Sequence, residues 1–490
     1  MFSFVVLKFA NRIRQPLVVL VTLSSITAGC GQLGQDDSGP TQTDQQPVPP
    51  NVILVVIDTL RADHLSTYGY VRPTSPILDR LAENALVYEN AFTVMSHTLP
   101  AHVSLMTGVH TATHKVLNNR WRYQGSHPLL AQLLKQRGYA TAAFVAGFPL
   151  RAESGLDAGF DLYEDTTMPD GRLLHKVAGE RITSHALKWL ESQQEGPFFL
   201  FVHYFDTHFP YEDPPDSQPP FKVDQVLADW MSDAGISDIQ IEDIAPTPIP
   251  LNGKPVDLPM LINAYDNQIH RVDHLIGQLL ETLKRLQLDT KTLLIITSDH
   301  GEGLGQHAYY AHGLHLYEEQ LRIPLIVRPP TTASWQPGRI ESTVSLLDLA
   351  PTVLDLVGLE PPPASPGIKL PLAPSSGTPK GRSILAERRF FLPEGRKRRG
   401  RFAAEPTLHV LRGDNPMKYF LDGDGTEQLY DLSTDPSELH NLASQRPEQC
   451  ARLHNDLQSL LEDRTADAAI VEQKMDEQTE RALRALGYIR

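Results

Sequence analysis

NVILVVID, residues 51–58, is the stretch that decides the fold: six consecutive apolar residues, Val52 to Ile57, end in the carboxylate of Asp58. A strand with one face in water alternates apolar and polar residues, whereas a strand covered on both faces is apolar throughout. We therefore predict that this stretch is a strand in a sheet that is covered on both sides.

Short apolar runs of this kind recur along the chain, with amphipathic segments between them. The other runs are Thr141–Val145, Phe198–Val202, Leu293–Ile296 and Pro324–Val327. The amphipathic segments are Ile77–Ala85, Leu129–Arg137, Leu174–Leu190, Leu261–Leu286 and Ser345–Val357. Alternating strands and helices favour the α/β class, with a mainly parallel sheet covered by helices on both faces. Functional side chains in such a sheet lie just beyond the carboxyl ends of its strands.

Polar side chains follow three of these runs at the point where each strand ends. Asp58 follows the first run, Asp206 and His208 follow FFLFVHY, and Asp299 and His300 follow LLIITS. An aspartate after a strand is also a common turn residue. Three strands that all deliver acidic or histidine side chains to one edge favour a functional site.

SHTLPAHVSLMTG, residues 96–108, is predicted to be a helix that begins near Thr98 and ends before Gly108. Proline at position 100 suits a first helical turn, and glycine suits the position just past the last turn. The unpaired N–H groups at such an N-terminus can hold an anion, and Thr98 could present a nucleophile there. The alternative is that Thr98 only caps the helix.

Residues 1–30 have the layout of an export signal, in which basic residues precede an apolar run at 16–26 that is too short to span a bilayer. The run ends in Thr27-Ala28-Gly29-Cys30, which resembles the lipobox of bacterial lipoproteins, where the cysteine is lipidated. A plain secretory signal is the alternative. Residues 31–50 are polar and read as a flexible tether. We therefore expect a lipoprotein-type signal peptide and a protein anchored by lipid on Cys30 in the bacterial cell envelope.

The formal net charge of −15 argues against a nucleic-acid partner. Besides Cys30 the sequence has one cysteine, Cys450, so a mature chain with lipidated Cys30 has no intramolecular disulfide. Cys450 is predicted to be a small buried residue rather than a reactive thiol.

Two regions differ in character from the predicted sheet. Residues 211–259 are rich in proline and aspartate with little periodicity, so they are predicted to form a long excursion over the mouth of the site.

A catalytic domain over 51–370 is followed by a smaller C-terminal α+β subdomain over 371–490, with a hairpin that turns at Gly-Asp-Gly, 423–425. Helices are expected near 448–463 and 470–486. The basic run at 388–401 is predicted to be a solvated loop, or else an attraction for anionic substrates or lipid head groups.

Several motifs, in this order, resemble the sulfatase family within the alkaline phosphatase superfamily. They are NVILVVIDTLRADHLSTYGY, TLPAHVSLMTG, HYFDTHFPY, SDHGEGLGQHAYYAHG, LYEEQLRIPLIV, SLLDLAPTVLDLVGL and EQLYDLSTDPSELHNLA, which span most of residues 51–445. The resemblance implies an alkaline-phosphatase-like mixed sheet with a smaller C-terminal sheet. It also implies a divalent-metal centre that cleaves sulfate or phosphate esters.

The sequence departs from the family pattern at the residues that matter most. Sulfatases carry Cys or Ser in C/S-x-P-x-R and oxidise it to formylglycine, whereas the matching residues here are Thr98, Pro100 and His102. Threonine would give a ketone, so no formylglycine is expected, and the supporting arginine is missing. Thr59 stands where many relatives have a second aspartate. His300 follows Asp299 where calcium-type sulfatases place asparagine or glutamine.

These departures favour a metal that accepts imidazole, so zinc or manganese is preferred and calcium is possible. Thr-x-Pro resembles the nucleotide pyrophosphatase/phosphodiesterase branch of the superfamily. By that resemblance one ion would be bound by Asp58, Thr98, Asp299 and His300. A second ion would be bound by Asp206, with His208 and His312 as further candidates and His307 as an alternative to His312.

The expected activity is hydrolysis of phosphate mono- or diesters, with Thr98 as a metal-assisted nucleophile. With a single metal ion, His208 or His312 would be the acid for the leaving group. Three alternatives remain: a sulfuric ester hydrolase that works without formylglycine, a transferase of a phospho-group onto envelope glycans, and a non-catalytic binding protein. The partner is an anionic ester substrate in each catalytic case.

Overall fold

Strand β1 (Asn51–Ile57) lies inside an eight-stranded sheet and is hydrogen-bonded in parallel to β6 (Phe198–Tyr204) and β9 (Thr292–Thr297). The sheet order is β14 (Gly338–Ile340), β2 (Leu86–Tyr88), β13 (Leu325–Arg328), β9, β1, β6, β4 (Ala140–Val145) and β5 (Leu162–Glu164). Strand β13 is antiparallel to both of its neighbours, and the other pairs are parallel. The computed structural model describes residues 49–167, 174, 176–193, 196–212, 218–244, 250–251, 254–362, 365–379, 382–388, 408–413 and 416–462.

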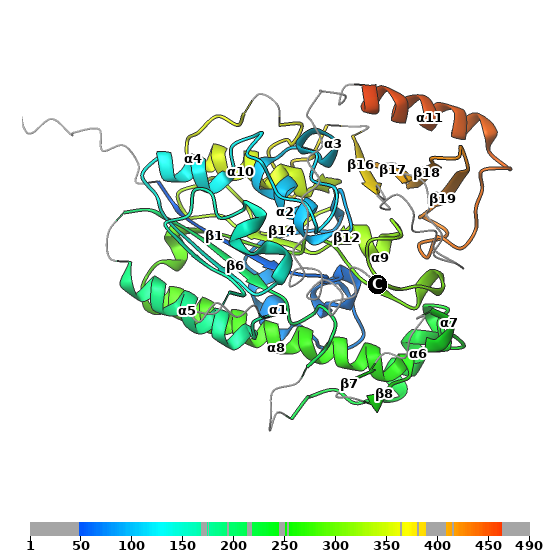
Figure 1. Ribbon diagram of the computed structural model, residues 1–490, viewed down its shortest axis with the longest axis horizontal. Coiled ribbons are helices and arrows are strands. Elements are labelled where there is room, and N and C mark those ends of the chain that lie inside the picture. The colour runs from blue at the N-terminus through cyan, green and yellow to red at the C-terminus, as the bar shows by residue number, and fades with distance from the viewer. Residues whose placement is uncertain are drawn as a thin grey trace, which may run out of the picture. The chain divides into compact units, whose positions relative to one another are not determined.

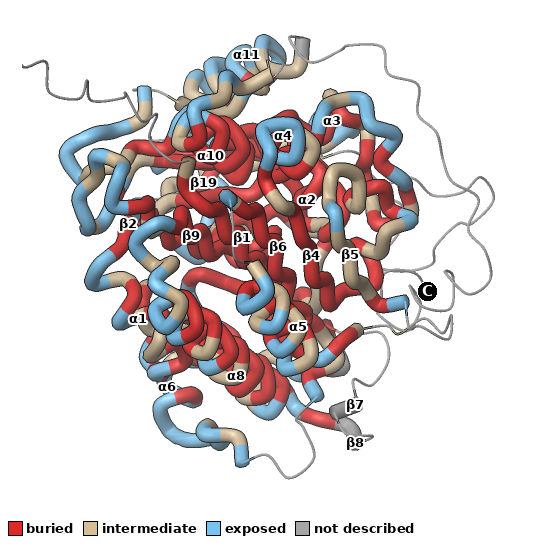
Figure 2. The backbone as a smooth tube through the Cα atoms, turned by 90° about the vertical axis from the view of Figure 1, so that its left-hand side faces the viewer, coloured by how far each residue is buried: buried red, intermediate tan, exposed pale blue. Residues whose placement is uncertain are grey.

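The apolar run of β1 is buried because its side chains enter two separate cores. Ile53 and Val55 pack with α1 (Pro76–Ala82), α5 (Gly179–Ser192) and α8 (Leu258–Arg285). Val52 and Leu54 pack on the opposite face. The helices of that face are α2 (Thr98–Thr107), α4 (Leu130–Gln136) and α10 (Leu349–Leu356). Figure 2 shows the strands as a buried layer between the two groups of helices. The predicted fold class is confirmed, and β13 makes the sheet mixed.

The smaller elements connect these layers. A three-stranded sheet contains β12 (Arg322–Ile323), β3 (Ala91–Phe92) and β15 (Val344–Ser345), and β10 (Gly303–Leu304) pairs with β11 (Tyr310–Ala311). Short α-helices are α3 (Thr111–His114) and α9 (Glu318–Leu321). The 3₁₀ turns are Ala62–His64, Ser66–Tyr68, Phe148–Leu150, Ala152–Ser154, Asp289–Lys291, Gln306–Ala308 and Leu346–Asp348.

The excursion at 211–259 contains more structure than its composition predicts. It carries α6 (Gln225–Asp233), α7 (Ile241–Ile244) and a hairpin of β7 (Pro250–Leu251) and β8 (Lys254–Pro255). Leu227 and Met231, four residues apart on α6, are buried. Trp230 packs edge-on against His64, with ring centroids 4.8 Å apart. Figure 1 shows α6 and α7 beside one end of α8.

The C-terminal part forms a separate antiparallel sheet of β16 (Ser383–Arg388), β17 (Leu408–Gly413), β18 (Met417–Asp422) and β19 (Glu427–Asp431), with α11 (Pro447–Glu462) beside it (Figure 1). The hairpin predicted to turn at 423–425 is β18 and β19. Phe92 and Leu316 share a hydrophobic cluster with Val410 and Phe420 of this sheet. The sheet thus packs directly on the catalytic part, and the boundary at 370/371 stays a prediction.

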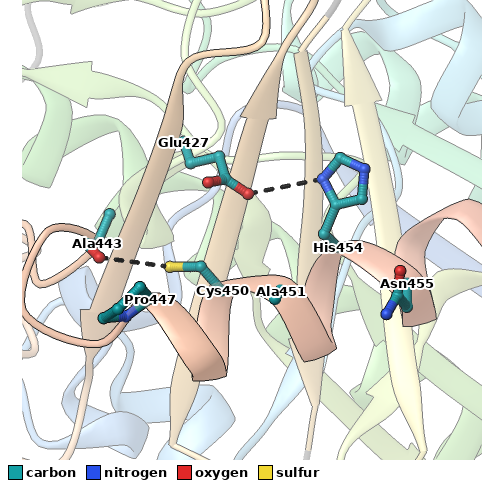
Figure 3. A pocket seen from close by; sticks show the side chains of 7 residues that line it. All are labelled: Glu427, Ala443, Pro447, Cys450, Ala451, His454 and Asn455. Carbon is teal, nitrogen blue, oxygen red and sulfur yellow. Dashed lines mark hydrogen bonds and ion pairs between the residues drawn. The ribbon is translucent and has the colours of Figure 1, made fainter.

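A cavity of about 310 Å³ lies between α11 and the C-terminal sheet, and Figure 3 shows the side chains that line it. Its ionisable side chains already face each other, since Glu427 Oε1 lies 3.6 Å from His454 Nδ1. Cys450 is buried and donates from Sγ to the carbonyl of Ala443 at 3.9 Å, as expected of a small buried residue.

Several expectations fall on parts of the chain that the structure does not describe. These are the signal peptide at 1–30 with Cys30, the tether except for residues 49 and 50, the helix near 470–486, and the basic run beyond Arg388. Arg388 itself is 1% exposed and donates to the carbonyl of Leu314, so the prediction of a solvated loop is wrong for this residue. Among the described helices, none combines the length and the apolarity that crossing a membrane requires.

Candidate metal centre and nucleophile

Asp58, Asp299 and His300 meet at the carboxyl ends of two neighbouring parallel strands. Asp58 directly follows β1, and the other two residues follow β9 after one serine. One ligand atom from each residue can be chosen so that all three lie within 4.8 Å of one another. All three side chains are fully buried. The sequence-based prediction that these residues share one site is therefore matched by their positions.

The carboxylate of Asp299 is held in one orientation by backbone donors. Its Oδ1 accepts hydrogen bonds from the N–H of Thr59 at 3.2 Å and of His300 at 2.9 Å, while Oδ2 has no hydrogen-bond partner. Thr59 adopts φ 56°, a left-handed conformation that is unusual for a β-branched residue. The residue at 59 thus contributes its amide to the site, where many relatives carry an aspartate.

The chemistry of Asp58, Asp299 and His300 suits a bound cation. Neither oxygen of Asp58 has a hydrogen-bond partner. Burial, followed by the nearby charges of Asp299 and Glu302, raises the pKa of Asp58 well above its ordinary value. Burial also lowers the pKa of His300 to about 4, so the imidazole is neutral at neutral pH. Its Nδ1 donates to the carbonyl of Gly301 at 2.9 Å, which leaves the Nε2 lone pair available to a metal.

Thr98 lies at this group because α2 begins there. It is the first residue of the helix, its Oγ1 is 3.5 Å from His300 Nε2, and its hydroxyl lies near Asp58, where it opposes the rise in the pKa of that carboxyl. Pro100 lies in the first turn, and Gly108 ends the helix at φ 69°, as the sequence predicts. Every residue of α2 is buried, so the hydroxyl is held in place by packing on all sides.

Two further histidines, His208 and His312, extend this group. The His312 ring lies 4.5 Å from that of His300 and 5.0 Å from that of His208, centroid to centroid. Glu302 Oε1 is 3.1 Å from His312 Nδ1. His208 stacks on Phe205 at 4.2 Å, and burial holds its pKa well below the ordinary value.

The structure separates the two alternatives, His307 and His312. His307 Nδ1 pairs with Glu319 Oε1 at 2.8 Å, and its ring stacks on Tyr317 at 3.5 Å. The residue therefore belongs to the packing of α9, whereas His312 lies beside His300. The roles of His312 as a metal ligand and as a catalytic acid stay predictions.

A loop whose two ends are joined carries His312. Gly301 N donates to Gln320 O at 2.9 Å, and Glu302 N donates to Glu319 O at 3.1 Å. A Cβ at Gly301 would lie 2.0 Å from the Glu319 carbonyl oxygen, so this close approach requires glycine. His312 is thus positioned by the same segment that follows the metal group.

Asp206 does not join the group of Asp58, Asp299 and His300, and its predicted role in binding a second ion stays a prediction. Its Oδ1 accepts from Gly179 N at 3.2 Å and lies 3.3 Å from Arg271 Nη1 on α8. The carboxylate is therefore used to attach the segment that carries His208 to α5 and α8. Among the described residues, Asp58, Asp299 and His300 form the one group of three acidic, histidine or cysteine side chains with metal-like spacing.

Sequence reasoning missed four residues that surround the group: His97, His102, His203 and Glu302. The sequence identified position 102 only as one that lacks the arginine of the family motif. It did not predict that the histidine there lies at the site. His203 is a polar residue inside the apolar strand FFLFVHY, and that is a signal that could have identified it. Burial, together with the neighbouring His312 and His300, lowers the pKa of His97 to about 3.

Comparison with known proteins gives a match at the level of family. Residues 50–359 match the sequence profile described as Sulfatase. Residues 305–467 match the profile described as N-sulphoglucosamine sulphohydrolase, C-terminal.

Individual relatives are distant in sequence but extensive in coverage. Iduronate 2-sulfatase of Homo sapiens is 27% identical over 421 residues, covering 71% of this chain and 74% of that enzyme. An arylsulfatase of Clostridium perfringens is 22% identical over 451 residues, covering 80% of this chain and 90% of that enzyme. The crystal structure of a phosphonate monoester hydrolase of Agrobacterium radiobacter gives a TM-score of 0.66 at 22% identity, over 85% of this chain and 96% of that chain, and supports the fold.

Proposed function

The chain belongs to the sulfatase family of ester hydrolases, and from that premise we propose that it hydrolyses phosphate mono- or diesters with Thr98 as the nucleophile. The observation that carries the proposal is the position of the Thr98 hydroxyl, near Asp58 and 3.5 Å from His300 Nε2. A threonine that only capped a helix would have no reason to lie between a carboxylate and an imidazole.

The proposed ion is a single divalent cation held by Asp58, Asp299 and His300, with Thr98 as a further ligand. When bound, it would favour the alkoxide form of Thr98 and stabilise negative charge on the reacting phosphoryl group. Enzymes of this family use a divalent metal ion, and the imidazole in this set supports zinc or manganese over calcium.

The chain's own residues supply the remaining steps. The oxygen of Thr98 attacks phosphorus in line with the leaving oxygen, and the bond from phosphorus to the leaving oxygen breaks. His312 gives the leaving oxygen its proton from Nε2, because the contact of Nδ1 with Glu302 holds the ring in that orientation. His208 remains neutral and contributes hydrogen bonding beside His312. Water then attacks the phosphothreonine, Thr98 is released, and His312 regains a proton from that water.

The chemistry of release favours phosphorus over sulfur. A sulfatase with formylglycine expels sulfate from a hemiacetal by breaking a carbon–oxygen bond. A sulfate ester on Thr98 has no such exit and must be attacked directly at sulfur. Hydrolysis of sulfuric esters without formylglycine is the second candidate, and the names of the relatives favour it.

The test compares three esters with one leaving group: 4-nitrophenyl phosphate, bis(4-nitrophenyl) phosphate and 4-nitrophenyl sulfate. The full chain, loaded with Mn²⁺ or Zn²⁺, is expected to have its highest kcat/KM on one of the two phosphate esters. Thr98→Ala should lower kcat on that ester by about a thousandfold or more, because the covalent step is lost.

Thr107→Ala is the matched control, since Thr107 is a buried threonine at the other end of α2 whose hydroxyl donates to Val103 O at 2.6 Å. It should leave kcat near the wild-type value. A higher kcat/KM on the sulfate ester would reject phosphate as the substrate class, and an active Thr98→Ala variant would reject the nucleophile.

A further inference from the structure

Two buried imidazoles lie behind the metal group, on the side away from His312. His102 comes from α2, one turn after Thr98, and His203 comes from β6. Both side chains are fully buried, and their rings meet edge to face with centroids 5.0 Å apart and planes at 83°. Nothing in the proposed reaction uses either ring.

Each imidazole approaches a different carboxylate of the group. His203 Nε2 lies 3.3 Å from Asp58 Oδ2, and both atoms are buried without a hydrogen-bond partner. His102 Nδ1 donates to the carbonyl of Thr98 at 2.8 Å and lies 3.6 Å from Asp299 Oδ2. The pair therefore touches the nucleophile's backbone and both acidic ligands.

The positions of the two rings do not make them ligands of the same ion. Ligand atoms of Asp58, Asp299 and His300, one from each residue, lie within 4.8 Å of one another. Among the described residues, no group of three that includes His102 or His203 has this spacing. A metal bound by that set would have these rings beyond its direct ligands. Hydrogen bonds from outer residues commonly orient metal ligands and set metal affinity.

Packing alone does not account for these residues. His203 Nδ1 and His102 Nε2 are buried with no hydrogen-bond partner, which costs stability that an apolar ring would not cost. The rings beside His203 are those of Phe201 on β6 and Phe205 just after it. A Cβ at Gly147 would lie 2.6 Å from Phe205 Cδ2 and 3.0 Å from His203 Cε1, so a glycine there leaves room for both rings.

A neutral imidazole also does something that an arginine cannot do. An imidazole that carries one N–H can face a carboxylate as a donor without adding positive charge. A guanidinium this close to Asp299 would neutralise part of the charge that holds the ion. The family pattern places arginine at position 102, and this chain places histidine there.

We propose that His203 is a positioning residue that orients Asp58 for the metal, and that the contact of His203 Nε2 with Asp58 Oδ2 at 3.3 Å raises the affinity of the site. The inference rests on the metal centre of the proposed function.

The test measures Mn²⁺ affinity of the full chain, after removal of metal, from the electron paramagnetic resonance signal of free Mn²⁺. His203→Phe keeps a ring between Phe201 and Phe205 but removes the donor, and it should weaken binding by about ten- to a hundredfold. His203→Gln places an amide donor near the position of Nε2 and should remain within about threefold of the wild type. His114→Phe is the control, because His114 is a buried histidine whose Nε2 contacts Ser104 Oγ at 2.9 Å on the far side of α2.

Each result distinguishes a role of His203 in metal binding from a role in packing alone. Equal affinity in His203→Phe and wild type overturns the inference, and so does an equal loss in His203→Gln and His203→Phe. If His203→Phe does not fold, His203→Gln is compared with His203→Leu, which lacks the donor. A wild-type chain that binds no Mn²⁺ or Zn²⁺ rejects the metal centre itself, and so is distinguishable from failure of the His203 contact.

Discussion

Asp206 and Asp299 look alike in the sequence but have opposite roles in the structure. Each follows an apolar strand closely and has one oxygen without a hydrogen-bond partner, yet Asp299 lies beside Asp58 and His300, whereas Asp206 is paired with Arg271 from α8. The partner decides the role, because a carboxylate already compensated by a guanidinium gains little from an ion.

Asp206→Asn is expected to bind metal as the wild type does, at the same number of ions per chain. Its free energy of unfolding should fall by about 1–3 kcal/mol, since the charged contacts to Arg271 and Gly179 are weakened while Arg271 keeps Glu180. Elemental analysis and urea denaturation measure the two quantities. Asp58→Asn is the positive control and should lose the ion. Loss of the ion in Asp206→Asn as well would restore the residue to the ligand set.

Residues directly after a strand could be predicted because their position is local. The apolar runs locate Asp58, Asp299 and His300 within a residue or two of the sheet edge, whatever the rest of the chain does. The partner of Asp206 could not be predicted, because Arg271 arrives from α8, 65 positions further along. His203 required knowing which face of β6 meets α2, and that depends on the whole sheet.

Helix α1 shows how one element is fixed by another. Asp273 of α8 accepts hydrogen bonds from Ile77 N at 2.8 Å and Leu78 N at 2.9 Å, at the N-terminus of α1. A side chain from a distant helix thus does what a local cap usually does. Burial nevertheless holds the pKa of Asp273 at about 7, despite these two donors.

This raised pKa predicts a pH dependence of stability. Since the pKa of Asp273 is higher in the folded chain than in the unfolded chain, its protonation stabilises the fold below about pH 4 and this contribution is lost as pH rises through about 7. Asp273→Asn should therefore be less stable than the wild type by a margin that is largest near pH 4 and shrinks toward pH 7. Urea denaturation at a series of pH values measures the margin. A constant margin would show that Asp273 does not titrate in this range.

Elements with a long apolar run or a long amphipathic face were predictable, and short ones in polar surroundings were not. The predicted runs correspond to β1, β4, β6, β9 and β13. Helix α5 begins at Gly179, later than predicted, because Gly179 N is held by Asp206 and the residues before it belong to the loop. Helix α6 was missed because two buried side chains in a segment rich in proline and aspartate give a weak periodic signal.

At the scale of the whole molecule, buried charges connect the C-terminal sheet to the catalytic part. Lys418 of β18 is fully buried and reaches Glu438 Oε1 at 2.8 Å and Glu318 Oε1 of α9 at 3.0 Å. Glu438 also accepts from Glu318 N at 2.6 Å, and its carbonyl oxygen lies 3.3 Å from His307 Nε2. The C-terminal sheet is thus tied to the segment that carries His312.

Lys418→Met is expected to destabilise the chain by about 3–5 kcal/mol, because it leaves two buried carboxylates with less compensating charge. Activity should fall with the packing of α9, and hydrogen exchange should rise in β17 and β18 and in residues 306–321. Thermal unfolding and hydrogen exchange measure these effects.

The double variant Lys418→Met, Glu438→Gln provides the control, since it removes one of the stranded charges and should recover part of the stability. Equal stability of Lys418→Met and the wild type would mean that the apolar contacts of Phe92 and Leu316 with the sheet suffice alone.

The joined ends of the segment from Gly301 to Gln320 have a consequence for how such an enzyme can diverge. Because the ends are pinned to each other, residues between them can be inserted or deleted without shifting Asp299 and His300. Descendants of this sequence can therefore lengthen or shorten that segment to admit larger or smaller leaving groups, and inherit the ion-binding strand ends unaltered.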